Sequence, residues 1–258
     1  MVTRELGPAW GRSWPPRIIA ERGATRDAPE NSLRAFREAV AAGADAIALD
    51  IMRCGTGEVV VFHERTLAMF GGGRWDDVAT TPLATLQEID LGGGERMPLL
   101  ADALVAIPVG ILIDIRLRAP SLTNEDHAEL AMIVMAIASQ ANAVERILIS
   151  SEDGDALTPF ADLGATTALL VPSMPLRVRR EPARTPSVVQ LEIHGLDAAT
   201  VRRWHARGAQ VHVWPTNTAS QFSVAWSLGV DGVLTNDPAG ARQAVDQMAR
   251  PRARSNAS

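Results

Sequence analysis

Polar side chains that can bind anions or exchange protons follow three apolar runs within residues 17–64. Glu21 and Arg22 come directly after the first run. Asp50 ends the second run, and His63 follows the third. In α/β enzymes, side chains at the ends of apolar strands gather at one face of the sheet or barrel, where the chemistry takes place. This stretch is therefore predicted to contain the centre of an active site.

A short turn, Cys54–Gly57, separates two β-rich runs at 45–53 and 58–63. A parallel crossover needs roughly a dozen residues or more, so the two runs are predicted to form an antiparallel hairpin. Counting outward from the turn places Asp50 opposite Phe62 or His63. The hairpin is thus expected to bring a carboxylate and an imidazole to the same place.

Strand-like and helix-like runs alternate through the rest of the chain. The strand-like runs are 17–21, 45–51, 110–115, 146–150, 167–171, 187–193, 210–214 and 230–235. After the helix that begins near residue 33, the helix-like runs are 99–106, 124–141, 153–163, 197–207, 218–228 and 238–248. Eight parallel strands that alternate with helices form a closed (β/α)8 TIM barrel, an α/β fold of typically about 250 residues.

The predicted barrel domain covers residues 17–248, and an insertion at about 64–98 follows the hairpin after strand two. Residues 1–16 are expected to form an N-terminal arm, and residues 249–258 a disordered tail. The insertion contains a short helix-like run at 83–89 between two glycine runs.

Composition limits the possible partners and location of the protein. The hydrophobic content of 47% supports a large core, and the net charge of −5 gives no reason to expect a nucleic-acid partner. No apolar run reaches the roughly eighteen residues of a membrane span, and the N-terminus lacks the apolar segment of a signal peptide. A soluble, cytoplasmic protein is expected. Its single cysteine, Cys54, cannot form an internal disulfide.

Taken in order, the motifs of this chain resemble those of the glycerophosphodiester phosphodiesterase family. That family's pattern is H-R-G, then P-E-N-[ST]-x-x-A-F, then G-A-D-x-x-E-x-D, then V-V-x-H-D. The matching residues are Arg22-Gly23, Pro29–Ser32, Ala35-Phe36, Gly43–Asp45, Asp50 and Val60–His63. Later matches are Ile113–Arg116, Ile147–Ser151, Trp214–Asn217 and Gly229–Pro238, so the likeness covers about residues 17–245.

The resemblance implies a TIM barrel that cleaves a glycerophosphodiester to an alcohol and sn-glycerol 3-phosphate in lipid metabolism, assisted by a divalent metal, Mg²⁺ or Ca²⁺. It implies that His63 takes part in proton transfer and that Arg22 binds the phosphate. Asp50 and Asp114 fall at positions of the family's metal-binding carboxylates. Glu30, Arg116 and Trp214 are further candidates for substrate binding, Glu30 by orienting the site and Trp214 as the wall of an alcohol or glycerol pocket.

Three positions in the first motifs depart from the family pattern. Glu21 stands where the family has its first histidine, Ala48 where it has a metal-binding glutamate, and Glu64 where it has an aspartate. Glu21 has three interpretations. It could join Asp50 and Asp114 as an oxygen ligand of the metal. It could be a general acid whose pKa is raised by burial. It could also form a salt bridge with Arg22 or Arg116 in a site that has lost catalysis.

Three functions therefore compete. The leading hypothesis is a metal-assisted hydrolase of a small glycerophosphodiester, in which His63 and Glu21 are catalytic. The alternatives are a catalytically silent relative that binds a phosphorylated ligand or a partner, and a repurposed lyase or cyclase on the same barrel. The barrel itself is compatible with all three.

Overall fold

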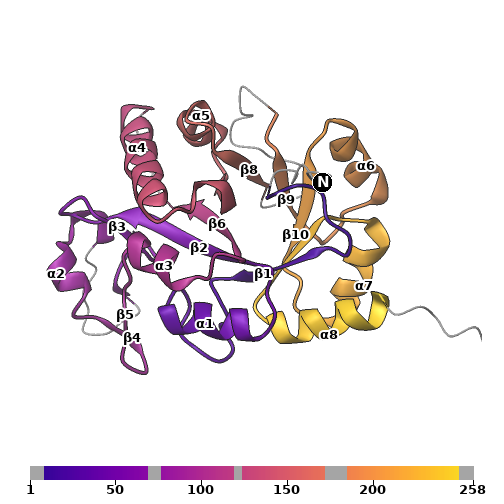
Figure 1. The fold of residues 1–258 in the computed structure, drawn as a ribbon, viewed down its shortest axis with the longest axis horizontal. Coiled ribbons are helices and arrows are strands. Elements are labelled where there is room, and N and C mark those ends of the chain that lie inside the picture. Colours follow the sequence, from indigo (N-terminus) through magenta and orange to yellow (C-terminus); the bar gives the residue numbers. More distant parts are fainter. Residues whose placement is uncertain (1–8, 69–76, 119–123, 172–184, 250–258) are drawn as a thin grey trace, which may run out of the picture.

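The computed structural model describes residues 9–68, 77–118, 124–171 and 185–249, and its centre is a closed parallel barrel (Figure 1). The barrel strands are β1 (Arg17–Glu21), β2 (Ala46–Arg53), β6 (Leu112–Leu117), β7 (Ile147–Ser151), β8 (Thr166–Val171), β9 (Val188–Glu192), β10 (Gln210–Trp214) and β11 (Gly232–Thr235). Each pairs in parallel with the next, and β1 pairs with both β2 and β11, which closes the sheet. The predicted TIM barrel is confirmed.

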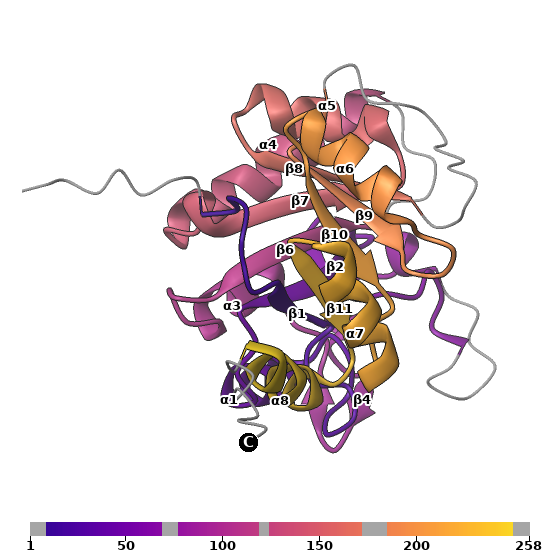
Figure 2. The same cartoon turned by 90° about the vertical axis from the view of Figure 1, so that its right-hand side faces the viewer.

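Helices cover the outside of the barrel (Figures 1 and 2). They are α1 (Leu33–Ala41), α3 (Leu100–Ala106), α4 (Asn124–Gln140), α5 (Gly154–Asp162), α6 (Ala198–Ala206), α7 (Ala219–Leu228) and α8 (Pro238–Ala249). Both views show α1 beside α8, and Arg242 of α8 donates to the backbone carbonyl of Gly43 at 3.0 Å. Among the described helices, none is long and apolar enough to cross a bilayer.

The predicted hairpin is present. β3 (Val59–Val61) pairs antiparallel with β2, with Ile51 opposite Val61. The backbone N–H of Phe62 donates to the carbonyl of Asp50 at 2.9 Å, so Asp50 and Phe62 face each other as the turn predicts.

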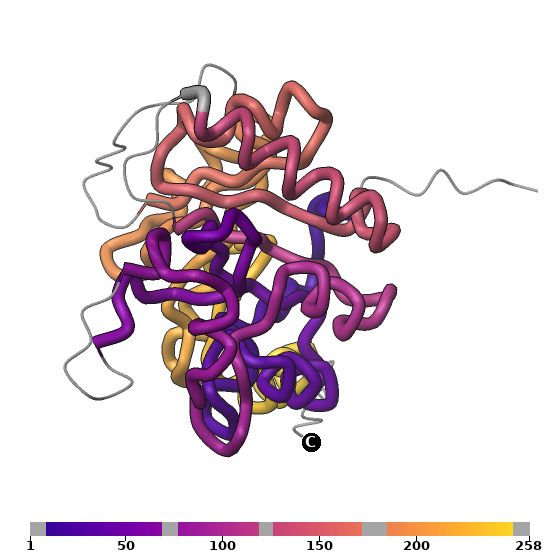
Figure 3. Tube along the Cα trace, turned by 90° about the vertical axis from the view of Figure 1, so that its left-hand side faces the viewer, coloured from indigo at the N-terminus to yellow at the C-terminus, as the bar shows by residue number. Residues whose placement is uncertain are grey.

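The insertion after the hairpin contains a 3₁₀ turn (Val78–Thr80), α2 (Leu83–Leu86), β4 (Asp90–Gly92) and β5 (Glu95–Arg96). Figure 3 shows this described part of the insertion by its purple and magenta colour. α2 is shorter than its predicted range. Leu86 and Met97 of the insertion pack with Met52 and Phe62 in a separate small core. The hairpin is therefore held from both sides, by the barrel and by the insertion.

One strand boundary differs from its prediction in a way that matters for the site. The strand predicted at 110–115 runs from Leu112 to Leu117, because a turn closed by Ile111 N–H and Pro108 carbonyl at 2.9 Å occupies the residues before it. Arg116 consequently lies within the strand rather than after it.

The N-terminal end of the barrel is filled by apolar side chains and by the arm. Trp10 is 2% exposed, belongs to the barrel's inner cluster, and donates from Nε1 to the Arg146 carbonyl at 3.0 Å. Its ring lies 5.9 Å from the ring of His212. A Cβ on Gly232 would come within 2.7 Å of that imidazole, so only glycine fits beside it. Complete burial lowers the pKa of His212 to about 3.

This buried imidazole predicts a loss of stability in mild acid. Unfolding restores the pKa of His212 from about 3 to 6.5, so the unfolded chain binds an extra proton between these values. Above pH 6.5 His212 is neutral in both states and costs no stability. Below pH 6.5 the free energy of unfolding falls by about 1.4 kcal/mol per pH unit, because only the unfolded chain takes up the proton. His212→Leu should flatten this dependence in urea unfolding at pH 7, 6 and 5. The exposed His194→Leu is the control, and an equal change in both variants would contradict the prediction.

Candidate active site

The register of three adjacent strands places the predicted carboxylates at one end of the barrel. Glu21 of β1 pairs with Ala48 of β2, and Ala48 pairs with Asp114 of β6. Two residues further along, Asp50 pairs with Arg116. Because strand side chains alternate between faces, residues two apart share the barrel interior. The carboxyl ends of the strands thus bring these residues together at the C-terminal face, where the sites of this fold lie.

Asp50 is held by two arginines and an amide. Its Oδ1 lies 2.7 Å from Arg118 Nε, and its Oδ2 lies 3.0 Å from Arg22 Nε and 3.1 Å from Asn31 Nδ2. Burial alone would raise the pKa of Asp50, but Arg116, Arg118 and Arg22 outweigh burial and hold the pKa below its ordinary value. Asp50 is therefore an ionised carboxylate with both oxygens engaged.

Asp114 is held by neutral donors. Ser150 Oγ donates to its Oδ1 at 2.6 Å, and Gln190 Nε2 donates to its Oδ2 at 2.5 Å. The side chain is fully buried, and burial raises its pKa despite the nearby Arg116. Both oxygens of this second carboxylate are also engaged.

The side chain of Arg116 reaches across a neighbouring strand to Glu21. It belongs to β6, yet its Nη1 donates to Glu21 Oε1 on β1 at 3.0 Å, with β2 in between. Arg116 is 4% exposed. Although burial alone would lower its pKa, Asp50, Glu21 and Asp114 together raise it, so the guanidinium stays charged. The salt bridge considered for Glu21 is present, and what it means for catalysis remains a prediction.

The loop after β1 positions Arg22 by an unusual backbone conformation. Arg22 has φ 58°, and its N–H donates to the Ala48 carbonyl at 2.7 Å. Gly23 follows with φ 89°, and a Cβ there would lie 2.6 Å from Ala35. Arg22 Nη1 then reaches Glu30 Oε2 at 2.8 Å. The glycine is required both for its positive φ and for this close packing.

His63 lies near the same glutamate. Its Nδ1 is 3.9 Å from Glu30 Oε1 and 2.9 Å from Glu64 Oε1. Glu30 therefore stands between Arg22 and His63. Trp214 ends β10 and packs against the apolar interior of the barrel, and its buried Nε1 has no hydrogen-bond partner among the described residues.

Four polar residues of this site were not predicted to hold the carboxylates: Asn31, Arg118, Ser150 and Gln190. Ser32, and not Asn31, caps α1 by accepting from Ala35 N–H at 3.1 Å, and Asn31 is turned to Asp50 instead. The role of Arg118 could have been predicted from the sequence, because Arg118 lies two residues after Arg116 and its side chain is therefore expected on the same face of the strand.

A divalent metal was predicted here, with Glu21, Asp50 and Asp114 as ligands. Within the described ranges, no group of three or more histidine, cysteine or acidic side chains is arranged to hold a metal ion. Asp50 and Asp114 use both their oxygens elsewhere, Glu21 is paired with Arg116, and Ala48 has no ligand atom. This arrangement does not fit Mg²⁺ or Ca²⁺, which take at least six oxygen ligands.

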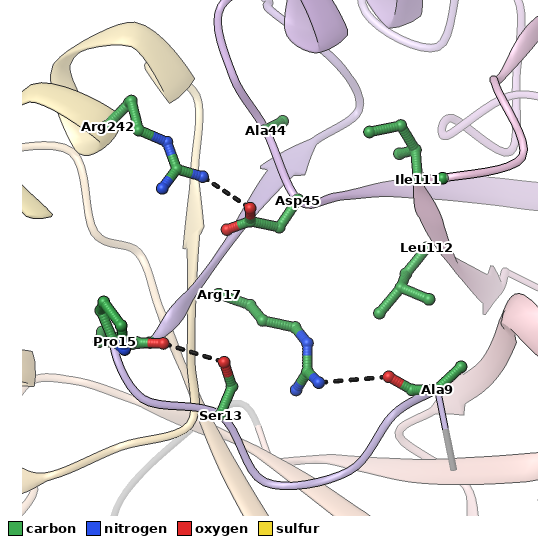
Figure 4. A pocket seen from close by; sticks show the side chains of 11 residues that line it. Ala9, Ser13, Pro15, Arg17, Ala44, Asp45, Ile111, Leu112 and Arg242 are labelled. Carbon is green, nitrogen blue, oxygen red and sulfur yellow. Dashed lines mark hydrogen bonds and ion pairs between the residues drawn. The ribbon is translucent and has the colours of Figure 1, made fainter. Parts of the chain in front are cut away.

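A cavity of about 480 Å³ lies at the opposite end of the barrel, between the arm and the starts of β1 and β6 (Figure 4). Arg17 and Asp45 line it, but Arg17 donates to the Ala9 carbonyl at 3.2 Å and Asp45 binds Arg242 at 2.6 Å. These charged groups hold the arm and α8 in place. The cavity is therefore separate from the carboxylate site.

An eight-stranded parallel barrel with arginines, carboxylates and a histidine at its C-terminal face defines a TIM-barrel protein with an enzyme-like site. The chain belongs to the glycerophosphoryl diester phosphodiesterase family, whose model matches residues 22–240. A glycerophosphodiester phosphodiesterase of Caldanaerobacter subterraneus subsp. tengcongensis is 26% identical over 240 residues, which cover 86% of this chain and 94% of the relative.

Solved structures share the fold. Glycerophosphodiester phosphodiesterase from Thermotoga maritima has a TM-score of 0.73 at 22% identity, covering 88% of this chain and 97% of the other. A phosphodiesterase from Oleispira antarctica, solved in complex with the product sn-glycerol-3-phosphate, has a TM-score of 0.77 at 23% identity, covering 90% and 97%.

Proposed function

We propose that the protein hydrolyses a small glycerophosphodiester to an alcohol and sn-glycerol 3-phosphate. The main support is the family match over residues 22–240, combined with Arg22 and His63 on either side of Glu30 at the barrel mouth. The Oleispira antarctica neighbour binds this same product, which favours a phosphorylated glycerol as the bound group.

Phosphate binding is assigned to Arg22 and Arg118. Their side chains are 21% and 24% exposed, so both reach the surface of the site while their Nε atoms are held by Asp50. A guanidinium matches the geometry of two phosphoryl oxygens and offsets their charge. Asp50 thus acts as a positioning residue, and Trp214 is proposed to wall the glycerol or alcohol group.

Proton transfer is assigned to His63 and Glu21. Water attacks phosphorus, one P–O bond forms, and the P–O bond to the alcohol breaks. His63 gives its proton to the departing alkoxide, and Glu21 takes the proton that the water loses. Arg116 holds Glu21 through Oε1 during this step. No step depends on a metal, because the carboxylates at this barrel mouth are engaged in a way that does not fit Mg²⁺ or Ca²⁺.

Release of sn-glycerol 3-phosphate from glycerophosphocholine, glycerophosphoethanolamine and glycerophosphoglycerol tests this proposal. Arg22→Met should lower kcat/KM by about 10- to 100-fold, because a charged hydrogen bond contributes about 1.5–3 kcal/mol. Arg26→Met is a matched control on the same loop, since Arg26 pairs with Asp237 at 2.6 Å and is largely exposed. Equal effects of both changes would contradict a phosphate-binding role for Arg22.

The silent alternative has one specific observation in its favour, the salt bridge between Glu21 and Arg116 at 3.0 Å. It predicts that the wild-type protein binds sn-glycerol 3-phosphate without turning over any of the three diesters. Binding by calorimetry and turnover by product release, measured on one preparation, separate the two functions.

A further inference from the structure

The barrel mouth contains a guanidinium cation, Arg116, beside three carboxylates. Asp50, Glu21 and Asp114 all act electrostatically on Arg116. The guanidinium reaches from β6 across β2 to Glu21, and Ala48 is the residue of β2 that lies between Glu21 and Asp114 in the register. The short side chain at position 48 leaves this path open. A glutamate there would bring a fourth carboxylate into the space that the guanidinium crosses.

Part of this guanidinium still lacks acceptors. Arg116 Nε and Nη2 are buried and have no hydrogen-bond partner in the described structure. Buried donors of a charged group are costly to leave unsatisfied, so an acceptor is expected at these atoms. The oxygens of Asp50 and Asp114 are already held by Arg118, Asn31, Ser150 and Gln190. An oxygen-rich anion is the kind of ligand that satisfies two donors of one guanidinium.

We propose that the Arg116 guanidinium takes the place of the divalent metal at this barrel mouth, so that the site binds a phosphoryl group without a metal ion. Arg116 neutralises Glu21 and Asp50 from within and presents Nε and Nη2 to the phosphoryl oxygens. This inference rests on the proposed function for its choice of ligand, a phosphorylated glycerol.

The first test measures binding of sn-glycerol 3-phosphate by calorimetry, in EDTA and in millimolar Ca²⁺ or Mg²⁺. We expect the wild-type affinity to change less than about twofold between these conditions, and its Tm not to rise with metal. Arg116→Met should weaken binding in EDTA by about tenfold or more, because the charge and both donors are lost. Arg53→Met is the control, since Arg53 pairs with Glu129 at 2.8 Å on the outer part of the hairpin.

The second test rebuilds a metal site. The double variant Arg116→Met, Ala48→Glu replaces the cation by a fourth carboxylate, so Ca²⁺ or Mg²⁺ should now raise the Tm in a saturable way. Arg116→Lys keeps the positive charge and should retain most of the binding of sn-glycerol 3-phosphate in EDTA. If the methionine variants do not fold, this variant still tests whether the charge at position 116 supports metal-free binding.

The outcomes separate this inference from the proposed hydrolysis. A saturable rise of the wild-type Tm with metal, or loss of product binding in EDTA, overturns the role of Arg116 while hydrolysis in the presence of metal still stands. Unchanged affinity in Arg116→Met also overturns it. Metal-free product binding without turnover of any diester supports Arg116 and contradicts the hydrolase. No product binding under any condition overturns the role of Arg116, and turnover of the three diesters then decides on the hydrolase separately.

Discussion

Replacing His63 by asparagine is expected to lower kcat for glycerophosphodiester hydrolysis by roughly 10²–10⁴-fold, the usual contribution of a general acid or base. Asparagine keeps a polar group of similar size but cannot donate a proton to an alkoxide leaving group. The His63 side chain is 21% exposed, and its Nδ1 lies 2.9 Å from Glu64 and 3.9 Å from Glu30, both partly exposed, so the loss should fall on proton transfer rather than on folding.

The leaving group makes this prediction sharper. A substrate that releases p-nitrophenolate needs little help from an acid, because that leaving group is already a weak base. His63→Asn should therefore recover much of its activity on a glycerol p-nitrophenyl phosphodiester, whereas a merely structural role would impair both substrates equally. His194→Asn, which changes an exposed histidine beside Glu192, is the matched control.

Two results would contradict the assignment. One is a His63→Asn variant with normal kcat on the natural diester. The other is an inactive wild-type protein in which Glu21→His creates turnover, since that would show that Glu21 does not serve as the base that the assigned pair needs.

The fold was predictable because its signals are local and repeated. Strands that are buried on both faces appear in the sequence as short apolar runs. The bounds of β1 and β10 in the structure equal the predicted ranges. The hairpin register followed from the length of one turn. The boundary of β6 was less predictable, because the turn at Pro108 shifts the strand by two residues without interrupting the apolar pattern.

The positions of the site residues were predictable, but their partners were not. Asp50 and Asp114 could be placed at strand ends from the sequence alone. Gln190, which holds Asp114, lies 76 residues away in the chain and comes close only because the barrel closes. Arg118 was missed because the predicted strand ended too early to include it. The salt bridge of Glu21 with Arg116 was one of the interpretations offered from the sequence, but the choice of Arg116 over Arg22 depends on a side chain that reaches across a whole strand.

Replacing Asp50 by asparagine is expected to lower the free energy of unfolding by about 3–5 kcal/mol, the usual cost of removing one partner from a buried ion pair. Asp50 is 1% exposed and touches Arg118 at 2.7 Å and Arg22 at 3.0 Å. Asparagine preserves the shape and the contact with Asn31 but leaves the two guanidinium groups without their shared counter-charge. Because both arginines reach solvent in part, the lower end of this range is the more reasonable expectation.

Urea unfolding at pH 7 measures the effect, and Glu129→Gln supplies the matched control. Glu129 pairs with Arg53 at 2.8 Å, a distance similar to that between Asp50 and Arg118. Its side chain is 52% exposed, so the loss of this pair should cost less than about 1 kcal/mol. A similar small loss for Asp50→Asn would mean that the desolvation of Asp50 nearly cancels its attraction to the arginines. In that case Asp50 would serve to orient Arg22 and Arg118 toward the ligand, and its replacement would weaken phosphate binding while the barrel kept its stability.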